Sequence, residues 1–305
     1  MAEVSETTLP AAPPMRFALL RLLRPRQWVK NGFVFAPLVF TGLFSEPHAL
    51  GLACAMAVLF AAASAVTYVF NDLYDLESDR RHPKKRLRRP LAAGAVTPGA
   101  AWAVLGILEA AVAAGAAGLA FHLGDAHAVA VLAVYQILNV LYTLKLKDVP
   151  IVDIFCVAAG FVLRVYAGAV VLSVPLSPWM LNTTLCLALF LVATKRLQEK
   201  KAHEDEARAV LREYPLSLLE YFTLLSAVGA LIFYGIFVLT VRKELALSIP
   251  LVLFGFFRYR YIVECLDMGE SPTDALWKDL PLALTVLAWA ALCAGSMLSL
   301  HPAGS

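Results

Sequence analysis

The chain has 305 residues, of which 60% are apolar and 16% are charged, and its mean hydropathy is +0.71. Soluble domains are about 45–50% apolar and about 25% charged, so this composition excludes a soluble globular protein and indicates an integral membrane protein. The net charge of +3 is too small to indicate nucleic-acid binding. The five cysteines lie in or near apolar segments without paired spacing, which argues against a disulfide framework and a zinc site.

Nine apolar segments have nearly the length that crosses about 30 Å of hydrocarbon. They are 31–47, 50–70, 100–121, 126–144, 151–173, 178–194, 217–241, 245–264 and 280–300. We therefore predict an all-α, polytopic membrane protein with about nine transmembrane helices. Eight spans remain an alternative, because 178–194 is short and 245–264 contains Pro250, Arg258 and Arg260.

The distribution of lysine and arginine predicts how the chain is oriented. These residues gather before the first expected span and after the second, fourth, sixth and eighth, whereas the opposite connections contain only Arg242 and Lys243. Because basic loops stay inside, we expect the N-terminus to be cytoplasmic and all long polar loops to face the cytoplasm. Residues 1–15 lack the features of a removable signal peptide and are expected to form a flexible tail before a single transmembrane domain, 16–305.

Three aspartates follow the second expected span, in the segment from Asn71 to Asp79. Successive residues of a helix are rotated by about 100°, so Asp75 lies about 60° and Asp79 about 20° from Asp72, on one helical face. Carboxylates at the end of a membrane span usually have a function. Their hard oxygen atoms suit Mg²⁺, which takes one or two carboxylates together with substrate phosphates. The pattern predicts a magnesium site and diphosphate chemistry at a membrane surface.

A basic loop comes within a dozen residues of these aspartates. Its sequence is His82-Pro83-Lys84-Lys85-Arg86-Leu87-Arg88-Arg89-Pro90. A polyanion chelated to Mg²⁺ needs both kinds of charge, because the metal joins carboxylates to phosphate oxygens while lysine or arginine neutralises the remaining charge. The alternative interpretation of the loop is a solvated run of charges.

These motifs together resemble a known family. Asn71-Asp72-x-x-Asp75-x-x-x-Asp79, followed by Arg80, His82-Pro83 and Arg89-Pro90-Leu91-Ala92-Ala93-Gly94, resembles the first motif of the UbiA superfamily of intramembrane prenyltransferases. The resemblance implies a UbiA-like helical bundle, with which nine helices agree. The basic loop has one residue more than the family pattern, so the phosphate contacts of its individual basic residues are not assigned.

Further segments resemble one branch of the superfamily, the decaprenyl-phosphate phosphoribosyltransferases. They are Leu23-Arg24-Pro25-Arg26-Gln27-Trp28-Val29-Lys30-Asn31, Leu141-Tyr142-Thr143-Leu144-Lys145, Asp153-Ile154 with Gly160-Phe161-Val162-Leu163-Arg164, Lys195-Arg196-x-x-Glu199 and Arg258-Tyr259. The resemblance extends from about residue 20 to residue 300. It implies transfer of 5-phosphoribose from phosphoribosyl diphosphate to a polyprenyl (decaprenyl) phosphate, with release of diphosphate.

The loop after the sixth expected span supports this branch. Typical UbiA prenyltransferases have a second aspartate-rich motif there, whereas this chain has Thr194-Lys195-Arg196-Leu197-Gln198-Glu199. A site with one acidic and one basic wall suits two anionic groups, one chelated to Mg²⁺ and one held directly by lysine and arginine. We expect both walls to face one pocket at the cytoplasmic membrane surface, with membrane lipids around it.

The expected site follows from these motifs. Asp72, Asp75 and Asp79 are the expected catalytic residues and Mg²⁺ ligands. Replacing Asp79 by alanine is expected to damage activity less than replacing Asp72. The expected substrate-binding residues are Lys30, Asn31, Asn71, Lys84, Arg86, Tyr142, Lys145, Lys147, Asp153, Lys195 and Arg196. Which cation binds which phosphate stays open.

Three polar residues have alternative interpretations. Asp153 lies near the cytoplasmic mouth and could reach ribose hydroxyls or the metal. Tyr142 is either a substrate contact or a member of an interfacial aromatic belt. Arg164 lies near the middle of the membrane, where a lone cation should face the bundle interior. A structural role for Arg164, with a carboxylate or carbonyl groups as partner, is favoured over substrate contact.

Two other functions compete with phosphoribosyl transfer. An aromatic prenyltransferase of the same fold would use a polyprenyl diphosphate donor, and the basic pair Lys195-Arg196 argues against it. A transporter would also be a helical bundle, but its polar residues should gather at the midplane within broken helices. Here nearly all of them are expected at one membrane surface.

Overall fold

The computed structural model describes residues 15–202, 209–266, 275 and 278–300, and every regular element in these ranges is helical. The elements are α1 Met15–Leu22, η1 Pro25–Phe35, α2 Ala36–Thr41, η2 Leu43–Ser45, α3 Pro47–Tyr74, α4 Leu76–Arg81, α5 Lys85–Arg88, α6 Pro98–Leu123, α7 His127–Leu144, η3 Leu146–Asp148, α8 Val152–Val171, α9 Pro178–Ala202, α10 Ala209–Arg212, α11 Leu216–Val241, η4 Lys243–Ser248, α12 Ile249–Cys265 and α14 Leu280–Leu300. The prediction of an all-α protein is confirmed. The expected tail lies almost wholly outside the described residues.

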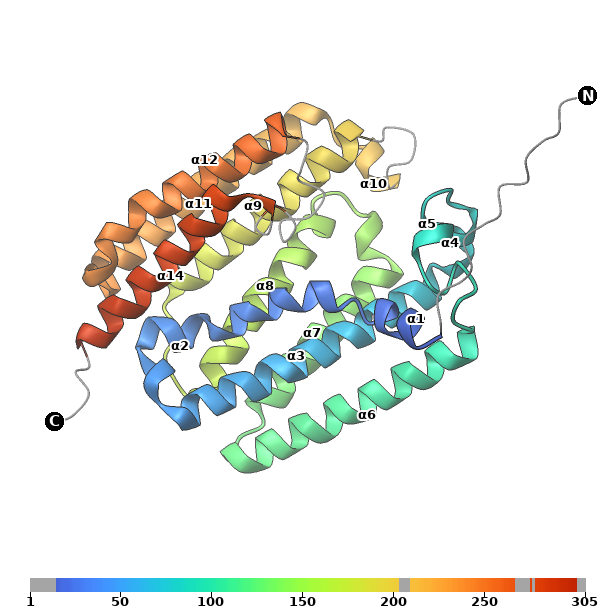
Figure 1. Cartoon of the computed structure of the whole chain (residues 1–305), viewed down its shortest axis with the longest axis horizontal. Coiled ribbons are helices and arrows are strands. Elements are labelled where there is room, and N and C mark those ends of the chain that lie inside the picture. Colours follow the sequence, from blue (N-terminus) through green and yellow to red (C-terminus); the bar gives the residue numbers. More distant parts are fainter. Residues whose placement is uncertain (1–14, 203–208, 267–274, 276–277, 301–305) are drawn as a thin grey trace, which may run out of the picture.

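Eight described helical stretches are long and apolar enough to cross a membrane. They correspond to α3, α6, α7, α8, α9, α11, η4 with α12, and α14, which match eight of the nine expected segments. Figure 1 shows these helices running side by side in one tilted bundle, with α1, α4, α5 and α10 at the same end. The chain is therefore a multi-pass membrane protein, as its composition indicated.

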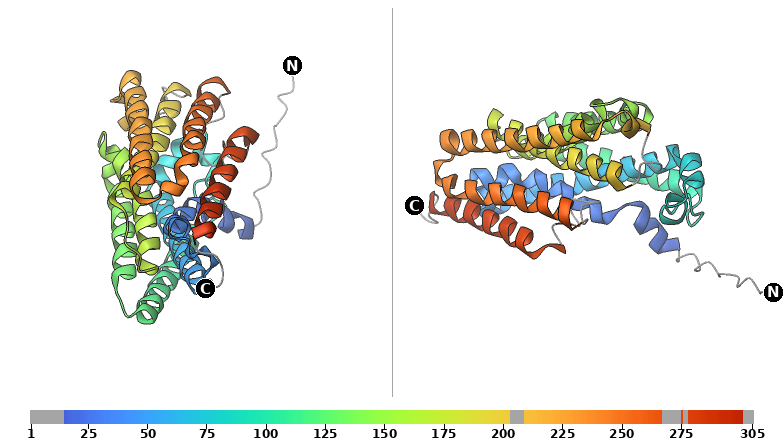
Figure 2. Two further views of the ribbon diagram at one scale, coloured as in Figure 1. Left: turned by 90° about the vertical axis from the view of Figure 1, so that its left-hand side faces the viewer. Right: turned by 90° about the horizontal axis from the view of Figure 1, so that it is seen from above.

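The remaining expected span, 31–47, is not one continuous helix. It is divided among η1, α2 and η2, and this section runs beside α3 in the opposite direction (Figure 1). Proline accounts for part of the division, because Pro37 stands in the first turn of α2, where its missing N–H is tolerated. Gly42 then ends α2 with a left-handed φ of 77°. In Figure 2 α1 and the last turn of α14 lie at opposite ends of the bundle.

A close backbone contact joins η1 to α8. A Cβ atom added to Gly168 would lie 2.0 Å from the carbonyl oxygen of Val34, so only glycine allows this approach. The contact brings η1, which contains Lys30 and Asn31, against the helix that contains Arg164.

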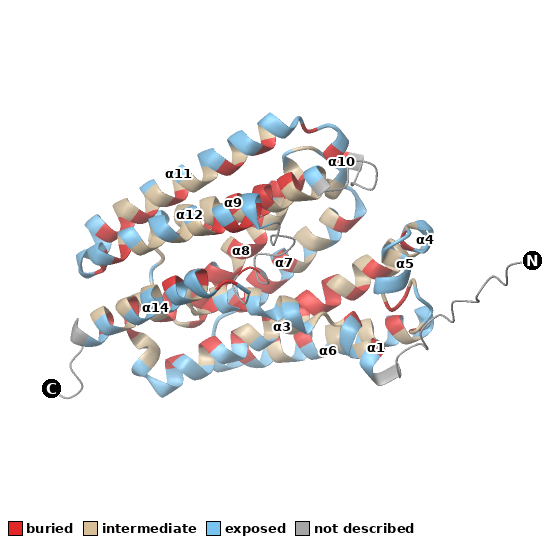
Figure 3. Cartoon of the chain, turned by 45° about the horizontal axis from the view of Figure 1, so that its top comes forward, coloured by how far each residue is buried: buried red, intermediate tan, exposed pale blue. Residues whose placement is uncertain are grey.

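Helix α8 is the most buried span, whereas α6 lies at the periphery. The share of buried residues in the most apolar window is 56% for α8 and 17% for α6, and Figure 3 shows α6 mostly exposed or intermediate. Polar side chains on α8 are thus enclosed by other helices, and α6 has most of its surface available to lipid. The functional site should therefore be sought around α8.

Candidate active site

A cavity of about 1150 Å³ lies within the bundle, between η1, α2, α3, α7, α8, α9, α11, α12 and α14. Charged and polar side chains line one part of it: Arg24, Lys30, Asn71, Arg89, Arg164 and Lys195. Apolar and aromatic side chains line another part, among them Phe40 on α2, Phe237 on α11 and Trp289 on α14. The cavity can therefore hold a molecule with an anionic group and a long apolar chain.

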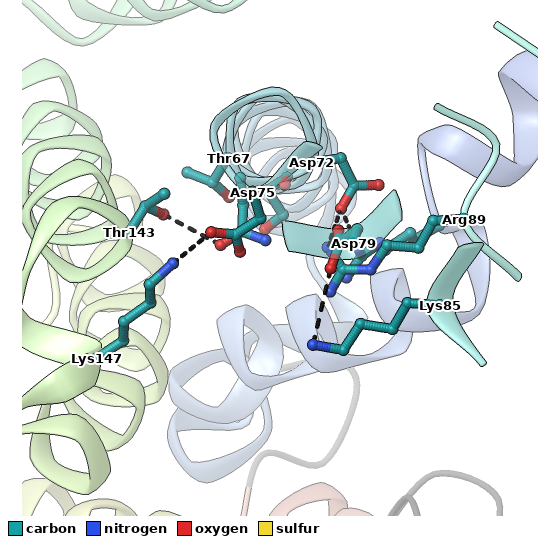
Figure 4. Close-up of polar contacts among 11 residues, drawn as sticks. Thr67, Asp72, Asp75, Asp79, Lys85, Arg89, Thr143 and Lys147 are labelled. Atoms are coloured by element: carbon teal, nitrogen blue, oxygen red, sulfur yellow. Dashed lines mark hydrogen bonds and ion pairs between the residues drawn. The ribbon is translucent and has the colours of Figure 1, made fainter. Parts of the chain in front are cut away.

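Two of the three aspartates converge on one arginine. Nη1 of Arg89 lies 2.9 Å from Oδ1 of Asp72 and also contacts Oδ2 of Asp79 (Figure 4). Arg24 donates to Asp72 at 2.5 Å, and Lys85 lies 3.7 Å from Asp79. Both carboxylates are almost fully buried, so the neighbouring cations replace the water that would otherwise stabilise their negative charges.

Asp75 has different partners because the helix breaks there. Helix α3 ends at Tyr74, Asp75 caps it, and α4 begins at the next residue. Asp75 accepts a hydrogen bond of 2.6 Å from Nζ of Lys147, and close to it Thr143 donates to Oδ1 of Asn71 at 3.5 Å (Figure 4). The aspartate segment therefore presents Asp72 and Asp79 to the basic loop and Asp75 to the α7–α8 connection.

The donor set fits a magnesium ion. No group of three His, Cys, Asp or Glu side chains in the described parts of the chain forms a ready-made metal site. Mg²⁺ does not require one, because it usually takes one or two carboxylates and completes its shell with water and phosphate oxygens. Oxygen atoms of Asp72 and Asp79 already meet at a single cationic nitrogen of Arg89, so this pair has the convergence that a metal ion needs.

The basic wall on α9 is tied to carboxylates. The buried guanidinium of Arg196 donates to Oδ2 of Asp153 at 3.1 Å, to Oε2 of Glu199 at 2.7 Å and to the hydroxyl of Tyr142 at 3.2 Å. Lys195 lies 3.7 Å from Glu199. Asp153 also accepts a hydrogen bond of 2.8 Å from Tyr214. Arg196 and Asp153 thus form a paired, hydrogen-bonded network at the cavity wall.

Arg164, by contrast, has only neutral hydrogen-bond acceptors among the residues that the structure describes. Its nitrogens donate to Oδ1 of Asn31 at 2.8 Å, the carbonyl of Gly160 at 2.7 Å, Oγ of Ser64 at 2.9 Å and the hydroxyl of Tyr135 at 3.0 Å. The structural role expected for Arg164 is present, since it links η1, α3, α7 and α8. The same side chain also lines the cavity.

Lys30 is a second cation that lines the cavity together with Arg164. It precedes the expected span 31–47 and lies outside the eight candidate spans. Burial, followed by the nearby charges of Lys195, Arg164 and Arg24, lowers the pKa of Lys30 from 10.5 to about 7. A bound anion would favour its charged form.

The structure brings together most of the expected site residues. Lys30, Asn71, Tyr142, Lys195 and Arg196 line the cavity, and Asn31, Asp153 and Lys147 contact residues that line it or belong to the aspartate segment. Lys84, Arg86 and Lys145 are exposed and do not line the cavity.

Sequence reasoning missed four contributors to the site: Arg24, Arg89, Tyr135 and Tyr214. Arg24 and Arg89 stand within the motifs that carried the family resemblance, so their position was a usable signal. Tyr135 and Tyr214 come from apolar or loop surroundings and had no such signal.

Comparisons with known proteins agree with this geometry. The UbiA prenyltransferase family model matches residues 33–278. A decaprenyl-phosphate phosphoribosyltransferase from Mycolicibacterium smegmatis is 32% identical over 311 residues and covers 95% of each chain. One from Mycobacterium tuberculosis is 33% identical over 285 residues and covers 90% of this chain and 92% of the relative. A solved UbiA homolog from Archaeoglobus fulgidus, bound to GPP and Mg²⁺, has a TM-score of 0.67 at 20% identity and covers 92% of this chain and 98% of its own.

The helical bundle is that of a multi-pass membrane protein, and the family match and the named relatives make it an enzyme of the transferase class. The chain belongs to the UbiA prenyltransferase family, and the curated relatives that match most of its length bear the name decaprenyl-phosphate phosphoribosyltransferase. The resemblance to that family and branch is therefore confirmed. The A. fulgidus structure confirms the fold.

Proposed function

We propose that this enzyme transfers 5-phosphoribose from phosphoribosyl diphosphate to a polyprenyl (decaprenyl) phosphate and releases diphosphate, in a Mg²⁺-dependent reaction at the cytoplasmic membrane face. The observation that carries the proposal is a single cavity of about 1150 Å³, lined by Asn71, Arg24 and Arg89 at one part, by other cations, and by an apolar chamber. Asp72, Asp75 and Asp79 do not line the cavity, but Arg24 and Arg89, which contact Asp72, do. The sugar diphosphate would bind beside the aspartate segment, the second phosphate at the other cations, and the isoprenoid chain in the apolar chamber. The names of the relatives support the same pair of substrates.

The reaction forms one bond and breaks another. An oxygen of the lipid phosphate attacks the anomeric carbon of the ribose, and the bond from that carbon to the diphosphate breaks, with its electron pair leaving on the diphosphate. The second pKa of a phosphate monoester is about 6, so the acceptor is largely dianionic at neutral pH and needs no general base. Catalysis then consists of positioning and charge stabilisation.

The residues of the aspartate end have the task of holding the donor. Asp72 and Asp79 are the residues that would hold Mg²⁺, with Asp75 and Asn71 beside them. The ion would neutralise charge on the departing diphosphate. Arg89 and Arg24 hold the buried carboxylates in place before substrate binds, and they would provide direct contacts for phosphate oxygens when the carboxylates engage the metal.

The test is an assay of detergent-solubilised protein with Mg²⁺, polyprenyl phosphate and phosphoribosyl diphosphate labelled in the ribose. We expect the label to move into the organic phase in the wild type, and not with EDTA or with Asp72→Asn. Label that stays in water with active protein would contradict the proposal. A parallel reaction with a polyprenyl diphosphate and a hydroxybenzoate tests for the aromatic prenyltransferase, which would give a prenylated ring.

A further inference from the structure

The cations around the cavity fall into two groups that differ in their counter-ions. Arg24, Arg89 and Lys147 contact aspartates of the segment 71–79, and Lys195 and Arg196 contact Glu199. Lys30 and Arg164 form no ion pair with a carboxylate of the described residues. We call these two residues, with Asn31, the Lys30–Arg164 cluster.

The positive charge of this cluster is expensive to bury. Arg164 is 5% exposed and bonds only to neutral oxygens. The pKa of Lys30 is lowered to about 7, chiefly by burial and then by three neighbouring cations. Buried charges are normally paired, because an uncompensated cation loses its hydration without a return in Coulomb energy. The rings of Phe60, Tyr135 and Phe161 contact Arg164 and compensate part of its charge, and an anion in the cavity would compensate more of it.

An unsatisfied donor points to the same conclusion. Asn31 is 3% exposed, and its Oδ1 accepts from Arg164 at 2.8 Å, whereas its Nδ2 is buried without a hydrogen-bond partner. Buried amide donors are rarely left unpaired, since each costs about 1–3 kcal/mol. The cluster therefore combines two cations that line the cavity with a spare neutral donor bonded to one of them, and this donor chemistry suits phosphate oxygens.

The position of the cluster along α8 suits a headgroup joined to a chain. Asp153, at the first turn of α8, belongs to the network at the cavity wall, and Arg164 lies eleven residues further, or about 16 Å along the helix axis. One turn beyond Arg164, a Cβ atom added to Gly168 would lie 2.0 Å from the carbonyl oxygen of Val34 on η1 and 3.2 Å from Cδ of Pro37 on α2, so α8 packs closely against both elements there. Helix α2 contributes Phe40 to the apolar part of the cavity. The cluster thus lies between the polar mouth and the apolar chamber.

We propose that Lys30 and Arg164, with Asn31, form a metal-independent site for the phosphate of the lipid acceptor, whose isoprenoid chain occupies the chamber lined by Phe40, Phe237 and Trp289. The proposal deepens the proposed function and rests on it for the identity of the acceptor. The two substrates would then be bound by different interactions. The sugar diphosphate would bind through a metal ion at the aspartate end, and the lipid monophosphate would bind directly to the cations of the cluster.

The first experiment measures binding without catalysis. Purified wild-type protein is titrated calorimetrically with farnesyl monophosphate in EDTA, with farnesol as the uncharged probe. We expect the monophosphate to bind equally well with and without Mg²⁺. A charged hydrogen bond is worth about 1.5–3 kcal/mol, so Lys30→Met and Arg164→Lys should each weaken binding about tenfold or more, whereas farnesol binding should stay within about twofold.

Lys201→Met is the matched control. Lys201 is a lysine outside the cavity that pairs with Glu264 at 3.0 Å and Glu220 at 3.7 Å, and its removal should leave farnesyl monophosphate binding unchanged. Because Arg164 also links several helices, the melting temperature of every variant is recorded with the titration. Lys30→Met, which removes no described hydrogen bond, keeps the test decisive if Arg164→Lys misfolds.

The second experiment separates the two substrates by kinetics. With Lys30→Met we expect the KM for polyprenyl phosphate to rise at least tenfold and the KM for phosphoribosyl diphosphate to change less than about threefold. The reverse pattern would overturn the proposal and assign the cluster to the ribose 5-phosphate. Monophosphate binding that requires Mg²⁺ would overturn it as well. Lys30-dependent binding without any ribosyl transfer would refute the proposed function and leave the anion site standing.

Discussion

The aspartate end and the Lys30–Arg164 cluster treat buried charge in opposite ways. At the aspartate end, Asp72 and Asp79 are each paired with two of the cations Arg24, Arg89 and Lys85 before any ligand arrives. In the cluster the cations face neutral oxygens and one another. Paired carboxylates can exchange their cations for a metal ion and a diphosphate, whereas cations without a carboxylate partner can bind an anion directly. The difference shows how one cavity can distinguish two phosphorylated substrates.

The largest effect should come from Asp72→Ala. Asp72 is the carboxylate that joins Arg24 to Arg89, and its loss removes a proposed metal ligand, deprives Arg24 of this carboxylate and leaves Arg89 with Asp79. We expect kcat to fall by about a thousandfold or more, as measured by ribosyl transfer. Asp79→Ala should lose about ten- to a hundredfold, because Asp72 remains on Arg89. Equal, complete loss in both variants would contradict this ranking.

Removing Arg89 should expose the metal affinity of the aspartate end. In Arg89→Gln the carboxylates of Asp72 and Asp79 lose the nitrogen that they share, so the melting temperature in EDTA should fall by several degrees. Added Mg²⁺ should raise the melting temperature, because the ion binds the folded state only. The rise should be larger than in the wild type, because Arg89 no longer competes with the ion for the two carboxylates. The readout is thermal unfolding, independent of activity. A variant whose stability does not respond to Mg²⁺ would count against a metal on these two carboxylates.

Gly168→Ala tests the Lys30–Arg164 cluster by disturbing the contact between η1 and α8 that positions it. The added methyl would meet the carbonyl oxygen of Val34, push η1 away from α8 and separate Asn31 from Arg164. We expect about 1–3 kcal/mol of destabilisation and a KM for polyprenyl phosphate raised about tenfold. Gly106→Ala on α6 is the matched control, since nothing lies within 4 Å of its added Cβ. Equal stability and equal KM values in Gly168→Ala and Gly106→Ala would contradict a role for the η1–α8 contact in acceptor binding.

The pH dependence of acceptor binding should report on Lys30. Only protonated Lys30 holds the phosphate, and its pKa of about 7 in the free protein means that affinity for farnesyl monophosphate falls as pH rises from 7 to 9, by at most about tenfold per unit. The ligand is dianionic throughout that range. Lys30→Arg should remove the slope, because arginine stays charged. The same slope in both proteins would assign the titration to another group.

The smallest effect should come from the outer part of the basic loop. Arg86 is exposed and does not line the cavity, although the sequence placed it among the substrate-binding residues. Arg86→Ala should lower kcat/KM by about threefold or less, far below the loss in Arg89→Ala, because exposed charges are screened by water. A loss as large as that of Arg89→Ala would restore Arg86 to the site and show that the loop closes over the donor.

Much of the fold could be predicted from hydropathy, because a membrane span needs a continuous apolar run. Eight of the expected segments are continuous helices. The segment 31–47 has the same composition but is divided, since Pro37 and Gly42 interrupt it and η1 packs against α8. The expectation that an acidic wall and the Lys195–Arg196 pair face one pocket stays a prediction, because Asn71, Lys195 and Arg196 line the same cavity but Asp72, Asp75 and Asp79 do not.

The pairing within the site was less accessible to sequence reasoning. Spacing on an ideal helix put all three aspartates on one face, but the chain leaves α3 at Tyr74 and turns Asp75 toward Lys147. Arg196 was a candidate for phosphate binding, and the structure engages it with Asp153 and Glu199. Local rotation angles hold only while the helix continues, and ion pairs between distant segments have no local signature.

The sequence by itself determined that this is a helical membrane protein, which side chains are charged, and that an aspartate motif stands at the end of an apolar span, because composition and local spacing carry that information. Only the tertiary structure decided which of those charges meet. Asn31 and Arg164 are 133 residues apart and share a hydrogen bond, whereas Lys30, next to Asn31, lies near the cations Lys195, Arg164 and Arg24. Charge balance depends on distances of a few ångströms between helices, and packing sets those distances.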